Sequence, residues 1–214
     1  MEFDAYIFDL DGTLLDTLDD LVFLTNKVLE ENNMPTHTRD EVNSYVGNGA
    51  RMLMKRAALA GTTDELIDSM LARWKALYPE LGHKYTKPYP GMEQALEELK
   101  SQGAKLAVLS NKFHEATVSV ISQHFPGVFD IVRGESPETP RKPDPTGLKR
   151  MMADLDVRPE YTAYVGDSGS DMTVALNAGA VPLGVTWGYR SAAELEQAGA
   201  FRLLNRPLEL ASKL

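Results

Sequence analysis

Residues 5–13 of the 214-residue chain read Ala5-Tyr6-Ile7-Phe8-Asp9-Leu10-Asp11-Gly12-Thr13. Four residues that favour β-structure followed by a carboxylate are typical of a short buried strand that ends at Asp9. Alternate residues of a strand share a face, so Asp9 and Asp11 could point toward one location. Gly12 permits backbone conformations closed to other residues and lets amide N–H groups approach an anion. The stretch predicts an acidic site at the end of a strand, with an ordinary Asp- and Gly-containing turn as the alternative.

Similar apolar runs recur along the chain, separated by helix-like patterns. The further predicted strands are Lys105–Leu109, Val128–Val132, Thr162–Val165 and Val181–Val185. A helical pattern over Met92–Gln102 is closed by a glycine, as many helices are. Strands that alternate with helices predict an α/β fold with a doubly wound parallel sheet covered on both faces. Such sheets bind ligands at the carboxyl ends of their strands.

The interval from about Leu14 to Leu81 departs from this alternation. It contains no convincing strand, and its helix-like stretches are Thr17–Asn32, Arg39–Val46, Ala50–Leu59 and Thr63–Tyr78. Prolines and a glycine in Lys84–Gly91 end helices and indicate a returning linker. We therefore expect an α/β core formed by residues 1–13 and 84–214, and a helical domain formed by residues 14–83. Because the inserted chain leaves and returns beside the strand that ends at Asp9, it could cover that site.

The composition excludes several classes of protein. The net charge of −9 argues against a nucleic-acid-binding surface, which needs clustered positive charge. The chain has no cysteine, which excludes disulfides, thiolate metal sites and thiol nucleophiles. No apolar run approaches the roughly 20 residues that span a membrane, and the acidic N-terminus is unlike a secretory signal. We expect a cytoplasmic protein without membrane partners. Ser212-Lys213-Leu214 spells a peroxisomal import signal, which is the alternative to the cytoplasm.

Two further segments place polar residues after predicted strands. Ser110 and Asn111 offer a hydroxyl and amide groups suited to phosphate oxygens, although a Ser-Asn pair is also a common helix cap. Lys142 lies in the segment Arg141-Lys142-Pro143-Asp144-Pro145, where it could supply a fixed positive charge to a phosphoryl oxyanion. A solvated loop lysine is the ordinary alternative.

The last such segment, residues 165–171, reads Val165-Gly166-Asp167-Ser168-Gly169-Ser170-Asp171. Asp167 and Asp171 lie four residues apart and would share a face if a helical turn begins there. Carboxylates without thiols suit Mg²⁺, whereas a capped helix start with an acidic first turn is the alternative. All four polar segments follow predicted strands, and the carboxyl ends of parallel strands lie along one edge. We therefore expect the segments to converge on a single site.

This ordered set of motifs resembles the haloacid dehalogenase superfamily of phosphotransferases over nearly the whole chain. The resemblance implies that Asp9 is the nucleophile and a metal ligand, and that Asp11 is the acid/base and gives the metal its backbone carbonyl. It also implies that Asp167 binds the metal directly, with Asp171 holding it or a bound water. The expected catalytic residues are Asp9, Asp11 and Lys142; those for substrate or phosphate are Gly12, Thr13, Ser110, Asn111, Lys142, Asn48 and Arg51; those for Mg²⁺ are Asp9, Asp11, Asp167 and Asp171.

Within that superfamily, the helical insertion is similar to a C1-type cap. The stretch Tyr45–Arg51 and the residues Lys55-Arg56-Ala57 look most like the cap of phosphoglycolate phosphatases. The resemblance implies a Mg²⁺-dependent hydrolase of a small phosphorylated metabolite, with 2-phosphoglycolate as the leading substrate. It implies substrate-reading roles for Asn48 and Arg51, although Arg51 could equally be an ordinary surface residue. The residues Glu135–Arg141 form a longer approach to the lysine motif than is usual.

Other functions stay open at this stage. A phosphomutase would use the same core and return the phosphate to a sugar, and a pyrophosphatase or nucleotidase would differ in substrate. A 2-haloacid dehalogenase would lack the second carboxylate, which Asp11 provides here. A phospho-receiver signalling module also combines acidic residues, a hydroxyl and a lysine, but it would be much shorter and would have no cap. No pattern indicates an oligomeric interface.

Overall fold

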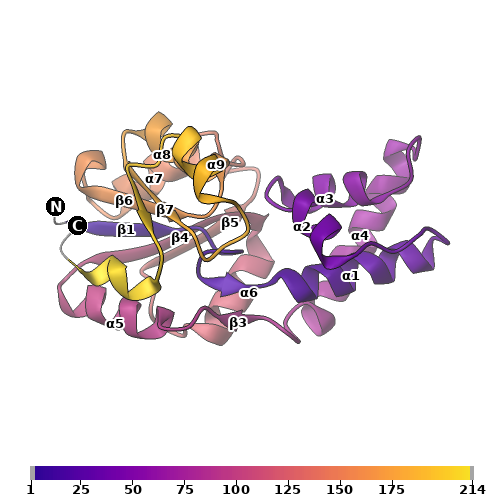
Figure 1. Cartoon of the computed structure of the whole chain (residues 1–214), viewed down its shortest axis with the longest axis horizontal. Coiled ribbons are helices and arrows are strands. Elements are labelled where there is room, and N and C mark those ends of the chain that lie inside the picture. The colour runs from indigo at the N-terminus through magenta and orange to yellow at the C-terminus, as the bar shows by residue number, and fades with distance from the viewer. Residues whose placement is uncertain (1–2, 213–214) are drawn as a thin grey trace. The chain divides into compact units, whose positions relative to one another are not determined.

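The computed structural model describes residues 3–212 (Figure 1). The chain divides into two compact units, a sheet unit that comprises the chain up to Asp16 and from Pro88 onward, and a helical unit, Thr17–Lys87. The expected domain limits, at residues 13/14 and 83/84, fall slightly earlier in the sequence, and the exact limits stay a prediction. Within residues 3–212, no helix combines the length and apolar character needed to cross a membrane. Lys213 and Leu214 of the C-terminal tripeptide lie outside the described residues.

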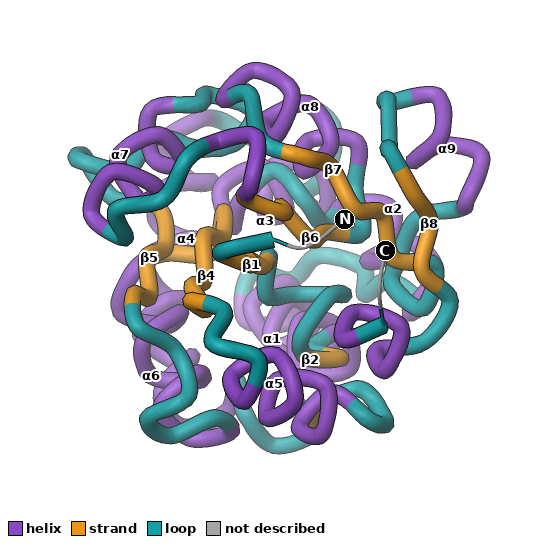
Figure 2. Tube along the Cα trace, turned by 90° about the vertical axis from the view of Figure 1, so that its left-hand side faces the viewer, coloured by secondary structure: helices purple, strands orange, loops and turns teal. Residues whose placement is uncertain are grey.

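The sheet unit is built on six parallel strands in the order β5-β4-β1-β6-β7-β8 (Figure 2). Their bounds are β1 Ala5–Phe8, β4 Lys105–Phe113, β5 Ile131–Glu135, β6 Thr162–Gly166, β7 Val181–Val185 and β8 Arg202–Leu204. In the register, Ala5 of β1 lies opposite Lys105 of β4 on one side and Thr162 of β6 on the other. The short strands β2, Leu15–Asp16, and β3, Lys87–Pro88, form a separate two-stranded sheet. The order confirms the expected doubly wound α/β sheet and places the end of β1 between those of β4 and β6.

Helices cover both faces of the sheet. They are α5 Met92–Ser101, α6 His114–His124, α7 Thr146–Asp154, α8 Gly169–Ala178 and α9 Ala192–Gln197, with short 3-10 helices at Pro159–Tyr161 and Pro207–Ala211. Tyr6 and Phe8 pack in one apolar cluster with residues of α5 and α6, and Ala5 and Ile7 pack in the other with residues of α7 and α8. Figure 2 shows these helix pairs on opposite sides of the strands. Alternate side chains of β1 therefore pack against the helices on both faces of the sheet. The burial of apolar surface stabilises this packing by about 25 cal/mol per Å².

The strands differ from their expected ranges in informative ways. β1 and β7 match, whereas β4 continues through polar residues to Phe113 instead of ending at Leu109. β5 begins at Ile131, later than expected, because Val128 and Phe129 precede the strand and pack on the core from a loop. β8 was not expected, since three residues at the edge of a sheet carry no usable periodicity.

The helical unit consists of four helices, α1 Leu18–Glu31, α2 Arg39–Tyr45, α3 Gly49–Ala57 and α4 Asp64–Leu81. This arrangement confirms the expected helical insertion after the first strand. Buried residues of α1, which include Leu21, Leu24 and Val28, form the face that packs against its neighbours α2 and α4. The Thr38 side chain and Glu41 cap the start of α2 reciprocally, which satisfies N–H groups that the helix leaves unpaired.

Candidate active site

Asp9 directly follows β1 and lies at the carboxyl edge of the sheet. Its N–H donates to the carbonyl of Val165 at 2.9 Å, which extends the pairing of β1 with β6 by one residue. The Lys142 ammonium lies 2.9 Å from Asp9 Oδ1 and 2.6 Å from Asp171 Oδ1. All three side chains are buried. The buried Lys142 ammonium therefore contacts both Asp9 of the first acidic motif and Asp171 of the last one.

The acidic loop after β6 holds its two carboxylates by different contacts. The Asp167 Oδ2 atom accepts the N–H of Tyr189 at 2.7 Å. The Asp171 Oδ2 atom accepts the N–H and the hydroxyl of Ser168 at 2.9 and 2.6 Å, as the capping box of α8. The condition for a shared helical face is not met, because Asp167 precedes α8 and only Asp171 belongs to it. Both oxygens of Asp171 are engaged, since Lys142 holds the other.

Three of the aspartates form a cluster that fits a divalent cation. Asp9, Asp167 and Asp171 each offer a carboxylate oxygen, and these oxygens lie within 4.8 Å of one another. Oxygens bound to one hard cation at 2.0 to 2.6 Å are separated by about this distance or less. Asp9 Oδ1 is buried and makes no directed hydrogen bond within residues 3–212, although the Lys142 ammonium is close. A buried donor set that contains only carboxylate oxygens suits such a cation.

The electrostatics of the cluster point the same way. Burial raises the pKa of Asp9 to about 6 against the opposing effect of Lys142. Burial, with the charges of Asp171 and Asp9, raises the pKa of Asp167 well above its ordinary value. Burial alone would lower the pKa of Lys142, but Asp171 and Asp9 outweigh it, and the pKa lies well above the ordinary value. Crowded carboxylates of this kind need a cation or a proton to coexist.

Gly12 and Thr13 contact Asp167 in this structure. Gly12 has a φ of +83°, and a Cβ at this position would lie 2.3 Å from Asp167 Oδ2. The hydroxyl of Thr13 donates to Asp167 Oδ1 at 3.4 Å, and the Thr13 carbonyl accepts the indole N–H of Trp187 at 3.0 Å. Gly12 and Thr13 of the first acidic motif therefore lie against Asp167 of the last one. That Gly12 and Thr13 bind phosphate stays a prediction.

Ser110 and Asn111 lie within β4 and do not follow it. The register of β4 with β5 shifts between Leu109 and Phe113, so the strand is irregular at these polar residues. Asn111 Oδ1 accepts the N–H of Lys142 at 2.7 Å, and Asn111 Nδ2 donates to the Lys142 carbonyl at 3.2 Å. Asn111 therefore fixes the main chain of the buried lysine. Its expected contact with phosphate, like that of Ser110, stays a prediction.

The structure adds a residue that the sequence did not single out. The Lys112 ammonium donates to both carboxylate oxygens of Asp11, at 3.0 and 3.1 Å. The Asp11 side chain is thus placed beside Lys112, outside the three-aspartate cluster. The sequence showed only that Lys112 follows an apolar run. No motif spacing identifies Asp11 as its partner. Tyr189 and Trp187 were missed because they reach the site from a loop after β7.

The long approach to Lys142 is folded into a turn. Ser136 and Thr139 exchange backbone hydrogen bonds of 3.1 and 3.0 Å, and Arg141 pairs with Glu135 at 2.8 Å. These contacts take up the additional residues locally. Lys142 therefore still reaches Asp9 and the cluster.

The expected substrate-reading residues lie in the helical unit and make contacts of their own there. Asn48 Oδ1 accepts a hydrogen bond from Arg56 at 2.8 Å. The Arg51 guanidinium pairs with Asp68 at 2.7 Å and with Asp64 at 3.1 Å. Whether either residue reads a substrate stays a prediction.

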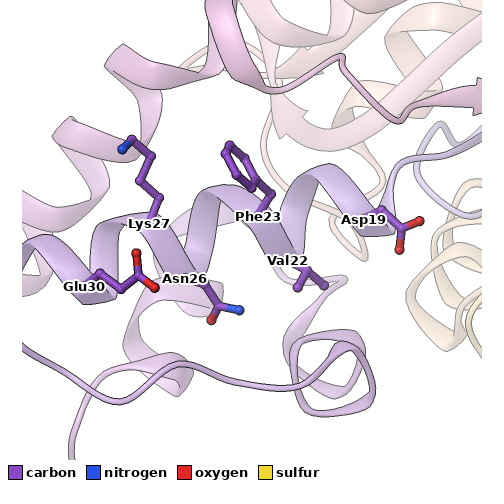
Figure 3. A pocket seen from close by; sticks show the side chains of 6 residues that line it. All are labelled: Asp19, Val22, Phe23, Asn26, Lys27 and Glu30. Carbon is purple, nitrogen blue, oxygen red and sulfur yellow. The ribbon is translucent and has the colours of Figure 1, made fainter.

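A hollow lies along α1 in the helical unit (Figure 3). Its volume is about 420 Å³, and its lining residues are Asp19, Val22, Phe23, Asn26, Lys27 and Glu30. Asp19 pairs with Arg39 at 2.8 Å. The Asn26 side chain accepts the N–H of His37 and donates to its carbonyl, both at 2.8 Å. These polar groups serve the packing of the helical unit, so the aspartate cluster is the stronger candidate.

Comparisons with known proteins agree with this geometry. A family model described as haloacid dehalogenase-like hydrolase matches residues 6–185. A phosphoglycolate phosphatase of Aquifex aeolicus is 34% identical over 184 residues, which cover 86% of this chain and 84% of that protein. One from Vibrio vulnificus is 37% identical over 191 residues, with 85% and 83% covered. A solved structure from Haemophilus somnus, described as a predicted phosphoglycolate phosphatase, has a TM-score of 0.89 at 26% identity and covers 98% of this chain and 97% of that one.

The matched region begins in β1 and ends with β7, so it includes the Asp9 motif, the helical insertion, Lys142 and the Asp167 loop. The chain therefore belongs to the haloacid dehalogenase-like hydrolases and is a phosphatase of that family that resembles phosphoglycolate phosphatases.

Proposed function

We propose that this phosphatase uses Mg²⁺ to hydrolyse a small phosphate monoester, with 2-phosphoglycolate as the leading substrate. One observation carries the proposal: the buried Asp9 carboxylate has the Lys142 ammonium 2.9 Å away and an oxygen within 4.8 Å of one from Asp167. A nucleophile, a positive charge and metal ligands are the groups that phosphoryl transfer needs. The choice of 2-phosphoglycolate is supported by relatives that carry this activity in their names.

The residues present suit Mg²⁺ as the cation. We assign the side chains of Asp9 and Asp167 and the main-chain carbonyl of Asp11 as its ligands, with Asp171 supporting the site through Lys142 and Ser168. Such a donor set contains only oxygen, which Mg²⁺ prefers. When bound, the cation would neutralise charge on the phosphoryl group and lessen its repulsion from Asp9.

The reaction we propose has two steps. A carboxylate oxygen of Asp9 attacks phosphorus, the bond from phosphorus to the ester oxygen breaks, and the Asp11 carboxyl group gives that oxygen its proton. Water then attacks the phosphorus of the Asp9 phosphate and gives its proton to the Asp11 carboxylate. The bond from phosphorus to Asp9 breaks, which restores the free carboxylate and releases inorganic phosphate. Lys142 and Ser110 stabilise the phosphoryl oxygens.

For substrate selection we propose Asn48 and Arg51 of the helical unit. The ion pairs of Arg51 with Asp64 and Asp68 are solvent-exposed, and such pairs contribute only about 0 to 1 kcal/mol. Exchange of these partners for the carboxylate of a substrate would therefore cost little. A guanidinium also binds a carboxylate through two parallel hydrogen bonds.

A phosphate-release screen tests the proposal. The substrates are 2-phosphoglycolate, hexose phosphates, nucleoside monophosphates and pyrophosphate, each with Mg²⁺ and with a chelator. We expect the highest kcat/KM for 2-phosphoglycolate and no release in chelator. No release from any substrate under any metal condition would contradict the hydrolase. Isomerisation of a hexose phosphate without phosphate release would indicate a mutase, and a long-lived phosphoprotein would indicate a receiver module.

A further inference from the structure

A buried ion pair lies beside the three-aspartate cluster. The side chain of Lys112 is 3% exposed and that of Asp11 is 16% exposed. The ammonium donates to both carboxylate oxygens of Asp11, at 3.0 and 3.1 Å. Removal of an ammonium from water costs several kcal/mol unless a well-placed carboxylate compensates it. A lysine at this depth is therefore held there by Asp11, and the two side chains form a unit.

The main chain of Lys112 is held by two further side chains. Its N–H donates to the hydroxyl oxygen of Ser110 at 3.3 Å, and its carbonyl accepts the hydroxyl of Thr117 at 3.2 Å. These contacts lie where the register of β4 with β5 shifts. Side chains thus satisfy backbone groups in the irregular part of the strand, and they set the direction in which Lys112 leaves it.

Asn111 and Lys112 are adjacent in β4 and bind two different residues of the site. Asn111 binds the main chain of Lys142, and Lys112 binds the side chain of Asp11. A carboxylate that accepts through both oxygens cannot rotate without the loss of a charge-assisted hydrogen bond. An acid/base must keep one oxygen within reach of the ester oxygen and later of the attacking water. A fixed orientation serves both needs.

We propose that Lys112 is a positioning residue that holds the Asp11 carboxyl group in the orientation required for both proton transfers. The inference rests on the proposed function, because Asp11 moves a proton only if the chain hydrolyses phosphate esters. Asp11 touches the reacting atoms, whereas Lys112 acts through Asp11.

The test compares two leaving groups in the full chain with Mg²⁺ bound, for wild type and Lys112→Met. The alkoxide of 2-phosphoglycolate needs a proton to leave, whereas 4-nitrophenolate does not, and water attack needs Asp11 in both cases. With 4-nitrophenyl phosphate we expect the variant to release about one equivalent of nitrophenol in a burst and then to turn over slowly as the phosphoenzyme accumulates. With 2-phosphoglycolate we expect no burst and a kcat lower by about 100-fold or more, the usual contribution of a general acid or base.

Two controls make the result specific. Lys105→Met changes a lysine of the same strand whose ammonium donates to the carbonyl of Leu155, and we expect wild-type kinetics from it. Asp11→Asn should show the same burst as Lys112→Met. The double variant Asp11→Asn/Lys112→Met should lose no further activity, because both changes remove one function.

The outcomes separate the alternatives. Equal losses on both substrates without a burst, or additive losses in the double variant, overturn the inference. So does a raised KM with unchanged kcat, which would show that Lys112 contacts the substrate itself. Lys112→Gln keeps a polar group without the charge, and it should give the same burst if Lys112→Met does not fold. Wild-type protein that hydrolyses neither ester overturns the proposed function and the inference together, whereas wild-type turnover with an unaffected Lys112→Met overturns the inference alone.

Discussion

Asp9 combines burial with charge, two properties that oppose each other in the free energy of folding. Burial raises its pKa to about 6, and the Lys142 ammonium opposes that rise only in part. A nucleophile of the proposed kind must nevertheless be ionised when substrate is bound. Perturbed carboxylates of this kind cluster at functional sites because a site is selected for reactivity and not for stability. Substitution of Asp9 should therefore change both the activity and the stability of the protein.

The first prediction concerns activity. Asp9→Asn keeps the size of the side chain and removes the nucleophile, so we expect kcat for phosphate release to fall by at least about 10⁴-fold. The circular dichroism spectrum should stay that of the wild type, since the substitution is isosteric. Turnover close to the wild-type rate in this variant would rule out Asp9 as the nucleophile.

The second prediction concerns stability in chelator as a function of pH. The pKa of Asp9 is raised from 3.8 to about 6 on folding. The folded state therefore binds this proton more tightly, and the stability it contributes is complete below pH 3.8 and lost as the pH rises through about 6. Asp9→Asn mimics the protonated form, so we expect it to gain stability relative to wild type over this range, by up to about 3 kcal/mol. Urea unfolding from about pH 3.5 to 8 measures the difference, which should grow up to about pH 6 and then level off. A difference that stays constant or falls between about pH 3.5 and 6 would contradict the assignment.

At the scale of the element, the sequence predicted the parts whose causes are local. β1 and β7 were predicted in full because a buried strand shows an apolar run of its own. The convergence of Asp9 and Asp167 was also predictable, since it follows from the carboxyl ends of parallel strands. The continuation of β4 and the pairing of Lys112 with Asp11 were not, because they depend on partners distant in the sequence. No window of the chain contains both halves of such a contact.

The third prediction concerns the loop after β1. Gly12 and Gly103 both have a positive φ, of +83° and +86°, but a Cβ at Gly12 would meet Asp167 at 2.3 Å, whereas one at Gly103 would meet nothing within 4 Å. Gly103→Ala should therefore cost only the backbone strain, about 1 to 2 kcal/mol, and leave kcat unchanged. Gly12→Ala should add displacement of Asp167 and lower kcat/KM by about 100-fold, as a shift near 1 Å at a reacting group does. Matching kinetics in the two variants would show that the contact with Asp167 is unimportant.

The fourth prediction concerns two adjacent aspartates of α1. The buried Asp20 carboxylate accepts the N–H groups of Lys84, Tyr85 and Thr86 and the hydroxyl of Thr86, at 2.7 to 3.1 Å. Asp20→Asn replaces one acceptor oxygen with an NH₂ group, which cannot accept these hydrogen bonds. Buried N–H groups are then left unpaired, so we expect the free energy of unfolding to fall by about 2 kcal/mol or more.

Asp19→Asn is the matched control for that substitution. Asp19 pairs with Arg39 at the surface, where both side chains are more than half exposed. Such pairs contribute about 0 to 1 kcal/mol, so Asp19→Asn should change urea unfolding little. Equal destabilisation by the two substitutions would mean that the contacts of Asp20 with the returning chain carry no special weight.

At the scale of the whole molecule, a protein of net charge −9 must bind an anionic phosphate ester. Local charge decides this, because a focused positive site can attract an anion within an acidic protein. The described site has four carboxylates, those of Asp9, Asp11, Asp167 and Asp171, against the ammonium groups of Lys142 and Lys112. That excess of negative charge repels a substrate phosphate unless a cation offsets it. The charge balance of the site is thus consistent with a divalent cation at the aspartate cluster.

The fifth prediction follows from that excess of charge. A cation that binds the folded chain but not the unfolded one stabilises it by mass action, by about 2.7 kcal/mol at a concentration 100 times its Kd. We therefore expect saturating Mg²⁺ to raise the Tm of the wild type, and to do so more strongly at pH 8 than at pH 5, because protons compete for Asp9. Asp167→Asn should remove most of the Mg²⁺-dependent shift, since it takes away a proposed direct ligand. Asp144→Asn changes a carboxylate that accepts the N–H of Thr146 at 2.8 Å outside the cluster, and it should keep the full shift. Thermal unfolding of the three proteins with Mg²⁺ and with chelator measures these shifts, and an undiminished shift in Asp167→Asn would place the cation elsewhere.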